Sequence, residues 1–409
     1  AALLFWGSLL SKVYVLPDQR PLLKPDTLSF PSINSVRRDR IVDAFIHSWD
    51  AYSKYAWGMD EINPCTSIGL NNWGGVAMTM IDALDTAILM RLNSRVQAAI
   101  EFIAHNFSFV KDYPMNTFEH TIRLLGGLIS SYDLTKDERL LNAAKLVGNG
   151  LLPAFAKEVL PEVNTLKRRA QFGYTSLAAK GSVQLEFARL ALITNSSCIS
   201  CRESFMYAAH SWKQFLKFAI KPNSLNGGDD SLHEYLLKLY LLGNSSDNVL
   251  RKSYNEMIFN VKKYLSYKSS GELFIVDRAN FTEHLACFFP GLVVLGVANK
   301  ASNYAEDDMR FAKQLLHGCY ILYEKNTVSG LAPDAIILYD SHMKITNPKF
   351  DLRPETIESI FYMWRHTGDI RYRKWAWRIF LSIEKHCKSR YGYSCLLYTS
   401  PSPRDLRLS

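Results

Sequence analysis

The chain has 409 residues, of which 48% are hydrophobic, 12% aromatic and 21% charged, and this composition excludes a disordered or fibrous protein. The net charge of +9 comes from lysines and arginines that are scattered along the chain, so nucleic-acid binding is not expected.

The two ends of the chain differ from the rest. Residues 1–10 form an apolar run without an initiator methionine, too short to span a bilayer. We interpret residues 1–33 as a stem or the remnant of a signal anchor. Residues 34–394 contain no linker and predict one large domain. Residues 395–409 have two prolines and no helical period, so we expect a non-native tail.

Apolar residues at three- and four-residue steps predict about thirteen helices and almost no strands. The expected helices cover residues 36–57, a segment from 79, 94–105, 117–132, 138–147, 176–193, 203–218, 231–242, 248–265, 284–299, 304–324, 354–367 and 370–387. Because each helical pair must bury its apolar stripe against the next pair, this order predicts an all-α solenoid or a closed α/α toroid.

Cysteines and glycosylation sequons favour a secretory compartment. The chain has seven cysteines, and N-x-S/T sequons occur at Asn106, Asn195, Asn244 and Asn280. Cys198 and Cys201 form a C-x-x-C pair, but no second pair completes a zinc site.

Acidic residues recur at the starts of expected helices. Pro354 suits a first helical turn, which places Glu355 and Glu358 at the N-terminal end, away from the apolar stripe. A glycine-rich turn likewise precedes Asp230, with Glu234 one turn later. Acids at these positions also complement the helix dipole, so each alone has an ordinary structural explanation.

Two further acids lie inside expected helices. Glu119 precedes Arg123 by one turn, a spacing that also fits a simple helix salt bridge. Glu186 lies in an apolar helix, where an acid is expected to be functional or paired.

Seven motifs occur in a fixed order along the chain. They are residues 56–61 (AWGMDE), 82–86 (DALDT), 118–123 (FEHTIR), 184–187 (QLEF), 230–238 (DSLHEYLLK), 284–288 (HLACF) and 352–359 (LRPETIES). In this order they resemble the class I α-1,2-mannosidases, glycoside hydrolase family 47, across about residues 36–394.

The resemblance implies a fold and a reaction. The fold is an all-α (α/α)7 barrel, which we expect to be incomplete at the C-terminus of this chain. The reaction is calcium-dependent (Ca2+) hydrolysis, with inversion, of terminal α-1,2-linked mannose from high-mannose N-glycans on glycoproteins. The expected protein is a monomer in the lumen of the endoplasmic reticulum or Golgi, secreted or held by an N-terminal membrane anchor.

The resemblance also assigns roles to residues. It makes Glu355 the general base and Glu119 the general acid, with Asp230 as a competing acid. Six further residues are expected to line the sugar site: Arg123, Glu186, Glu234, His284, Arg353 and Glu358. Asp82 and Asp85 are second-tier candidates, and Cys287 and Cys319 match the family's paired cysteines.

The sequence departs from the family in two places. The family's calcium-binding threonine, near its C-terminus, is missing, so no metal ligand is expected in this chain, and we expect weak calcium binding and little activity. Gly228 stands where relatives that remove one mannose carry arginine, which favours the type that removes several. Two alternatives are a degradation-pathway (ERAD) protein that selects misfolded glycoproteins and a non-catalytic helical scaffold.

Overall fold

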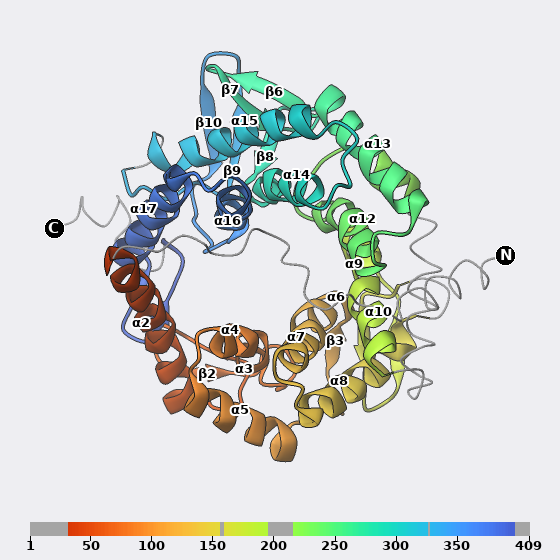
Figure 1. Ribbon diagram of the computed structural model, residues 1–409. Helices are drawn as coiled ribbons and strands as arrows, with labels where there is room; N and C mark the ends of the chain where they lie inside the picture. Colours follow the sequence, from red (N-terminus) through yellow and green to blue (C-terminus); the bar gives the residue numbers. More distant parts are fainter. Residues whose placement is uncertain (1–31, 156–158, 195–215, 326–327, 397–409) are drawn as a thin grey trace. The chain divides into compact units, whose positions relative to one another are not determined.

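The computed structural model describes residues 32–155, 159–194, 216–325 and 328–396. They belong to two compact units, one of residues 45–216 and one of residues 1–44 together with 217–409. Helices dominate both units, as Figure 1 shows.

The unit of residues 45–216 combines helices with two small antiparallel sheets. Its helices are the C-terminal part of α2 (Ser32–Tyr55), α3 (Met78–Asp82), α4 (Leu84–Leu89), α5 (Asn93–Asn106), α6 (Thr117–Glu119), η1 (His120–Leu125), α7 (Gly126–Thr135), α8 (Glu138–Leu151), η2 (Leu152–Ala154), α9 (Leu177–Ser182) and α10 (Gln184–Ile193). Its strands are β1 (Glu61–Ile62), β2 (Gly69–Leu70), β3 (Pro114–Asn116), β4 (Glu162–Asn164) and β5 (Arg169–Gln171). Strand β1 pairs with β2, and the other sheet has the order β3-β4-β5.

Helix α8 shows why these segments are helical. The Asp137 side chain caps its first turn by accepting a hydrogen bond from the backbone N–H of Arg139. Leucines, alanines and a valine then recur on one face, and that face is buried.

Two contacts position α3 in this unit, one at its start and one near its end. The buried carboxylate of Asp60 accepts short hydrogen bonds from the backbone N–H groups of Trp73, Gly75 and Val76, which holds the loop before α3. Gly127 of α7 lets the two helices approach closely, because a Cβ there would lie 2.6 Å from the carbonyl oxygen of Ile81. Asp60 therefore positions the start of α3, and Gly127 allows the close contact at its end.

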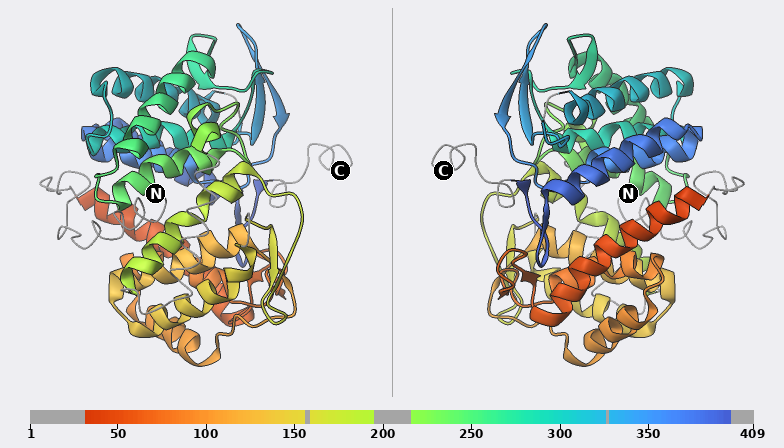
Figure 2. Two further views of the ribbon diagram at one scale, coloured as in Figure 1. Left: turned by 90° about the vertical axis from the view of Figure 1, so that its right-hand side faces the viewer. Right: turned by 90° about the vertical axis from the view of Figure 1, so that its left-hand side faces the viewer.

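The other unit has longer helices and three antiparallel sheets. Its helices are α12 (Asp230–Leu242), α13 (Asn248–Tyr264), η3 (His284–Phe288), α14 (Phe289–Ala298), α15 (Ala305–Glu324), α16 (Glu355–Thr367) and α17 (Ile370–His386). Its strands are β6 (Ser266–Ser269), β7 (Glu272–Ile275), β8 (Phe281–Glu283), β9 (Ala335–Leu338), β10 (Met343–Asn347), β11 (Lys388–Ser389) and β12 (Gly392–Tyr393). The sheets are β6-β7, β11-β12 and β10-β9-β8, and the blue arrows in Figure 2 include the β9–β10 hairpin.

Helix α14 forms the centre of this unit. It is strongly apolar, nearly all its residues are buried, and it packs against α12, α15 and α16. A disulfide between Cys287 and Cys319 joins η3 to α15, as the resemblance implied. The disulfide therefore links the short helix that carries His284 to the core of the unit.

Most predicted helices are present with ends shifted by a few residues, and the strands are few and short, which agrees with the near absence of an alternating pattern in the sequence. The strands have only two to five residues, too few to show a clear alternating pattern. The predicted helix 176–193 is interrupted at Val183. The predicted helix 203–218 falls mostly outside the described residues, as do the stem at 1–31, Asn195, the Cys198–Cys201 pair and residues 397–409. Among the described helices, none is both long and apolar enough to cross a membrane.

Candidate active site

The N-terminal end of α16 places Glu355 beside a buried histidine. A Glu355 carboxylate oxygen lies 3.3 Å from His284 Nδ1, and the Tyr323 hydroxyl lies 2.6 Å from His284 Nε2. Burial raises the pKa of Tyr323, so its hydroxyl stays protonated, and the Thr356 hydroxyl also lies 3.1 Å from Nε2, which gives this nitrogen two hydroxyl groups that can donate to it. His284 is then left with its proton on Nδ1, directed at Glu355. The carboxylate is thereby oriented.

Asp230 is the first residue of α12 in the same unit. Burial raises the pKa of Asp230 to about 6, and the nearby negative charges of Glu234 and Glu355 contribute to the increase. A carboxyl group with such a pKa is still protonated in about one molecule in ten at pH 7. Asp230 can therefore donate a proton where Glu355 can accept one.

A lysine lies among the acids that face one another from α12 and α16. Lys238 Nζ is 2.6 Å from a carboxylate oxygen of Glu234, one turn earlier on α12. Burial raises the pKa of Glu358 to about 7, partly opposed by the charge of Lys238. Burial alone would lower the pKa of Lys238, but the negative charges of Glu234 and Glu358 raise it, so the lysine is charged. Lys238 thus partly neutralises a cluster of like charges.

Arg353, just before α16, is fixed by a neighbouring loop. Its Nε donates to Asp334 Oδ1 at 2.8 Å, and the Asn347 side chain donates to the other Asp334 oxygen at 2.9 Å. Burial alone would lower the arginine pKa, but the hydrogen bond and charge of Asp334 together with the charges of Glu355 and Asp351 raise it. This pair holds the residues that precede Glu355.

In the unit of residues 45–216, Arg123 joins two predicted acids. Its Nε lies 2.8 Å from a Glu119 carboxylate oxygen, and its Nη1 lies 3.5 Å from Asp82. Burial raises the pKa of Asp82, while Arg123 opposes that increase. The cluster therefore has more carboxyl groups than positive charges.

An unusual turn of helix presents this cluster. The Asn116 side chain caps α6 by accepting a hydrogen bond from the Glu119 backbone N–H at 2.9 Å. The chain then continues as a π-helix, η1, which contains Arg123. Such segments are rare and occur frequently at functional sites. The local backbone thus favours a functional role over a plain surface salt bridge.

The last two predicted residues of this unit lie beside α7. Asp85 accepts a hydrogen bond of 2.6 Å from the Ser130 hydroxyl, which ties α4 to α7. The side chain of Glu186 passes Gly126, where a Cβ would lie 3.6 Å from its Cγ. Asp85 therefore has a structural contact that its motif did not reveal.

The predicted residues fall into two groups, one in each compact unit. Asp82, Asp85, Glu119, Arg123 and Glu186 lie in one unit, and Asp230, Glu234, His284, Arg353, Glu355 and Glu358 lie in the other. The sequence analysis missed Lys238, Tyr323 and Asp334. Lys238 follows Glu234 at a salt-bridge spacing and was recognisable, whereas Tyr323 and Asp334 are brought in only by the fold. Within the described ranges, no group of three or more His, Cys, Asp or Glu side chains is arranged to hold a metal ion.

Comparison with known proteins identifies the family. The family model described as "Glycosyl hydrolase family 47" matches residues 44–403 of the chain. The chain belongs to glycosyl hydrolase family 47. Family membership places it among the glycosidases, as its motifs predicted.

Relatives and a solved structure agree with this assignment. The chain is 32% identical to a mannosyl-oligosaccharide 1,2-alpha-mannosidase of Arabidopsis thaliana, over 92% of this chain and 72% of that protein. It is 31% identical to the human endoplasmic reticulum mannosyl-oligosaccharide 1,2-alpha-mannosidase, over 95% of this chain but only 61% of the human protein. The structure is similar to an alpha-1,2-mannosidase from Trichoderma reesei, with a TM-score of 0.79, 24% identity, and coverage of 88% of this chain and 87% of that one. This similarity confirms the all-α fold of the α/α-barrel class.

Proposed function

We propose that the chain hydrolyses terminal α-1,2-linked mannose from high-mannose N-glycans, with inversion at the anomeric carbon. The observation that carries the proposal is the pair at the starts of α12 and α16, one carboxyl group with a raised pKa and one held by a histidine N–H. Inverting glycosidases need one carboxyl group that donates a proton and a second that accepts one. The names of the family relatives supply the sugar and the linkage.

Glu355 is the proposed base. Its side chain is only 17% exposed, and the proton on His284 Nδ1 orients one of its oxygens. It accepts a proton from the attacking water as that water attacks the anomeric carbon. Tyr323 fixes the tautomer of His284 and so acts on Glu355 indirectly.

Two residues compete for the role of acid. The raised pKa of Asp230 favours the protonated form, whereas the Glu119 carboxylate is engaged in an ion pair with Arg123. Asp230 therefore has the more suitable surroundings for donating a proton to the leaving oxygen. Glu119, the first choice from the sequence, would need to receive its proton through a water.

Calcium is part of the proposal because the family resemblance implies it. The donor set fits a hard cation bound through water, because Glu234, Glu355 and Glu358 offer carboxylate oxygens in one unit. When bound, the ion would supply positive charge that offsets carboxylate repulsion and would order water and sugar hydroxyls. Direct protein ligands are not proposed from the described residues.

The secretory lumen is the proposed compartment. The named human relative is an endoplasmic reticulum protein, and Cys287 and Cys319 form a disulfide. The sequon asparagine Asn106 is exposed at the end of α5, and Asn244 and Asn280 are half-buried in turns. The degradation-pathway alternative stays open because it would use the same sugar site.

The test measures mannose release from a high-mannose glycan by NMR, with and without a chelator. The initial product should be β-mannose, and Glu355→Gln should lower kcat at least a hundredfold while Kd changes little. An activated aryl mannoside separates the acids, because a good leaving group needs no proton. Of the variants Asp230→Asn and Glu119→Gln, the one that removes the catalytic acid should regain activity on that substrate. Initial formation of α-mannose, or a Glu355→Gln variant with normal kcat, would reject the assignment.

A further inference from the structure

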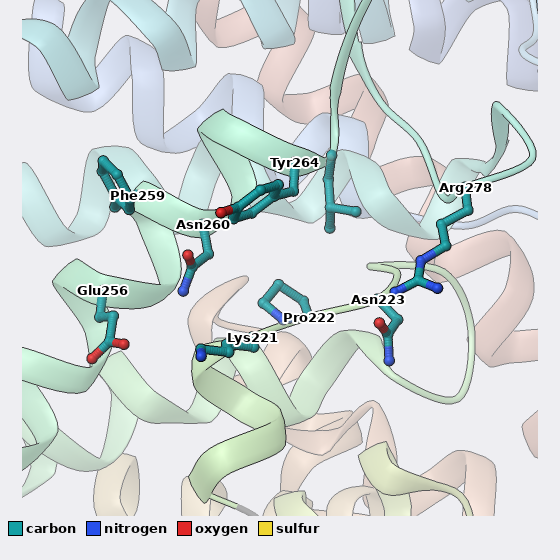
Figure 3. Close-up of a pocket in the computed structure, with 9 residues that line it drawn as sticks. Lys221, Pro222, Asn223, Glu256, Phe259, Asn260, Tyr264 and Arg278 are labelled. Carbon is teal, nitrogen blue, oxygen red and sulfur yellow. The ribbon is translucent and has the colours of Figure 1, made fainter.

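A polar hollow lies at the C-terminal end of α13, away from the acids described above. It has a volume of about 710 Å³, within the range of ligand sites. Phe259, Asn260 and Tyr264 face it from α13, and Lys221 and Arg278 approach from two loops, as Figure 3 shows. We call it the α13 hollow.

The α13 hollow adjoins the loops that carry catalytic candidates. α12 and α13 are consecutive packed helices, so the end of α13 lies beside the start of α12, where Asp230 is located. The segment after Lys221 is fastened to the end of β8, because the Asn226 side chain accepts a hydrogen bond of 2.9 Å from the Glu283 backbone N–H. The next residue after Glu283 is His284. A ligand in the hollow would therefore lie near the rim of the candidate site.

The surroundings indicate the chemistry of the occupant. Phe259 and Tyr264 are 59% and 65% exposed, and Lys263 Nζ lies over one face of each ring, 5.8 Å and 4.9 Å from the centroids, so only the opposite face of each ring is offered to the C–H surface of a sugar. The positive charges of Lys221 and Arg278 are largely offset by the Glu256 carboxylate and the partial negative charge at the helix C-terminus, so the lining has little net charge to attract an ion. An apolar ligand would leave the charged heads of Lys221 and Arg278 without partners. A neutral polyol satisfies all of these groups.

We propose that the α13 hollow is an accessory subsite for one arm of a branched, neutral oligosaccharide, while the terminal mannose of another arm occupies the active site. This inference rests on the proposed function. It predicts that the hollow contributes to the affinity of branched glycans and contributes nothing to that of a disaccharide, which is too short to reach it.

The test compares Kd values of the full chain for a Man9GlcNAc2 oligosaccharide and for α-1,2-mannobiose by calorimetry or saturation-transfer NMR. The variant is Phe259→Ala combined with Tyr264→Ala. The control is Tyr304→Ala, since Tyr304 is an aromatic residue, 72% exposed, at the start of α15. The double variant should raise Kd for the branched glycan about tenfold, equivalent to about 1.4 kcal/mol, and change Kd for mannobiose less than twofold. The control should change neither.

Four other outcomes overturn the inference: no effect of the double variant, equal weakening of both ligands, no binding of the free glycan by the wild type, or an effect seen only with a glycopeptide. The last outcome would show that the hollow binds the peptide part of a glycopeptide and not the glycan. Failure of the proposed function is distinguishable, because the wild type would then neither bind mannobiose nor release mannose.

Discussion

Asp230→Asn should stabilise the folded protein while it lowers activity. The Asp230 carboxyl group has a pKa of about 6 in the folded state, compared with 3.8 for an ordinary aspartate, the value expected in the unfolded chain. The folded state therefore binds this proton more tightly than the unfolded state does. Relative to low pH, stability from this group is lost as pH rises from about 4 to about 6.

The size of the effect follows from the same shift. About two pKa units correspond to roughly 3 kcal/mol of cost to the folded state once Asp230 is ionised, at 1.36 kcal/mol per unit. The residue is only half-buried, so solvent screening reduces the expected cost to about 1–2 kcal/mol. An asparagine side chain carries no charge at any pH in this range. The variant should therefore gain that amount at pH 7.5 and only about a third of it at pH 4.5.

The assay is thermal or denaturant unfolding at pH 7.5 and 4.5, in chelator so that bound calcium does not alter the local charge. The control is Asp112→Asn, because Asp112 is exposed and its pKa is lowered by hydrogen bonds from Lys167 and Asn164. That control should give no gain at pH 7.5. A variant at Asp230 that is not stabilised at pH 7.5, or is stabilised equally at both pH values, would refute the reasoning.

Three further perturbations test other contacts. Lys238→Met should destabilise the protein by about 2–4 kcal/mol and move the pH profile of kcat, whereas Lys136→Met, in an exposed pair, should cost less than about 0.5 kcal/mol in the same unfolding assay. Cys319→Ser should cost about 3–4 kcal/mol on the chain-entropy model, and peptide mapping without reductant should show its bond to Cys287 in the wild type. Asp60→Asn should lower the melting temperature by several degrees, because an amide cannot accept all the backbone N–H bonds that this carboxylate accepts.

Helical periodicity was informative about the fold because most helices of the chain are long and amphipathic. α13 and α15 each bury one face along most of their length, so their apolar residues recur often enough to show the helical period. The short strands offered no such repetition. β8 and β9 pair across more than fifty residues of sequence, and that pairing depends on tertiary structure alone.

Contacts within the candidate site were predictable only where one element carries both partners. Glu119 and Arg123 share a helical face, and this pair was visible in the sequence as a spacing of four residues. The contact of His284 with Tyr323 joins η3 to α15 and has no local signature. Gly228 illustrates a third case, since its φ of +92° shows that the loop before α12 uses a backbone conformation that side chains rarely adopt. An arginine at this position would require a different loop.

The placement of acids at helix starts carries a stability cost that the fold has to offset. A helix N-terminus favours an ionised carboxylate, yet Asp230 at the start of α12 and Glu358 in the first turn of α16 both have raised pKa values. Burial and mutual repulsion therefore outweigh the helix dipole at both positions. Lys238, which opposes the shift of Glu358, limits this cost without removing it. Such a balance is typical of a site that must keep one carboxyl group protonated beside an ionised one, and a purely structural cluster would gain nothing from it.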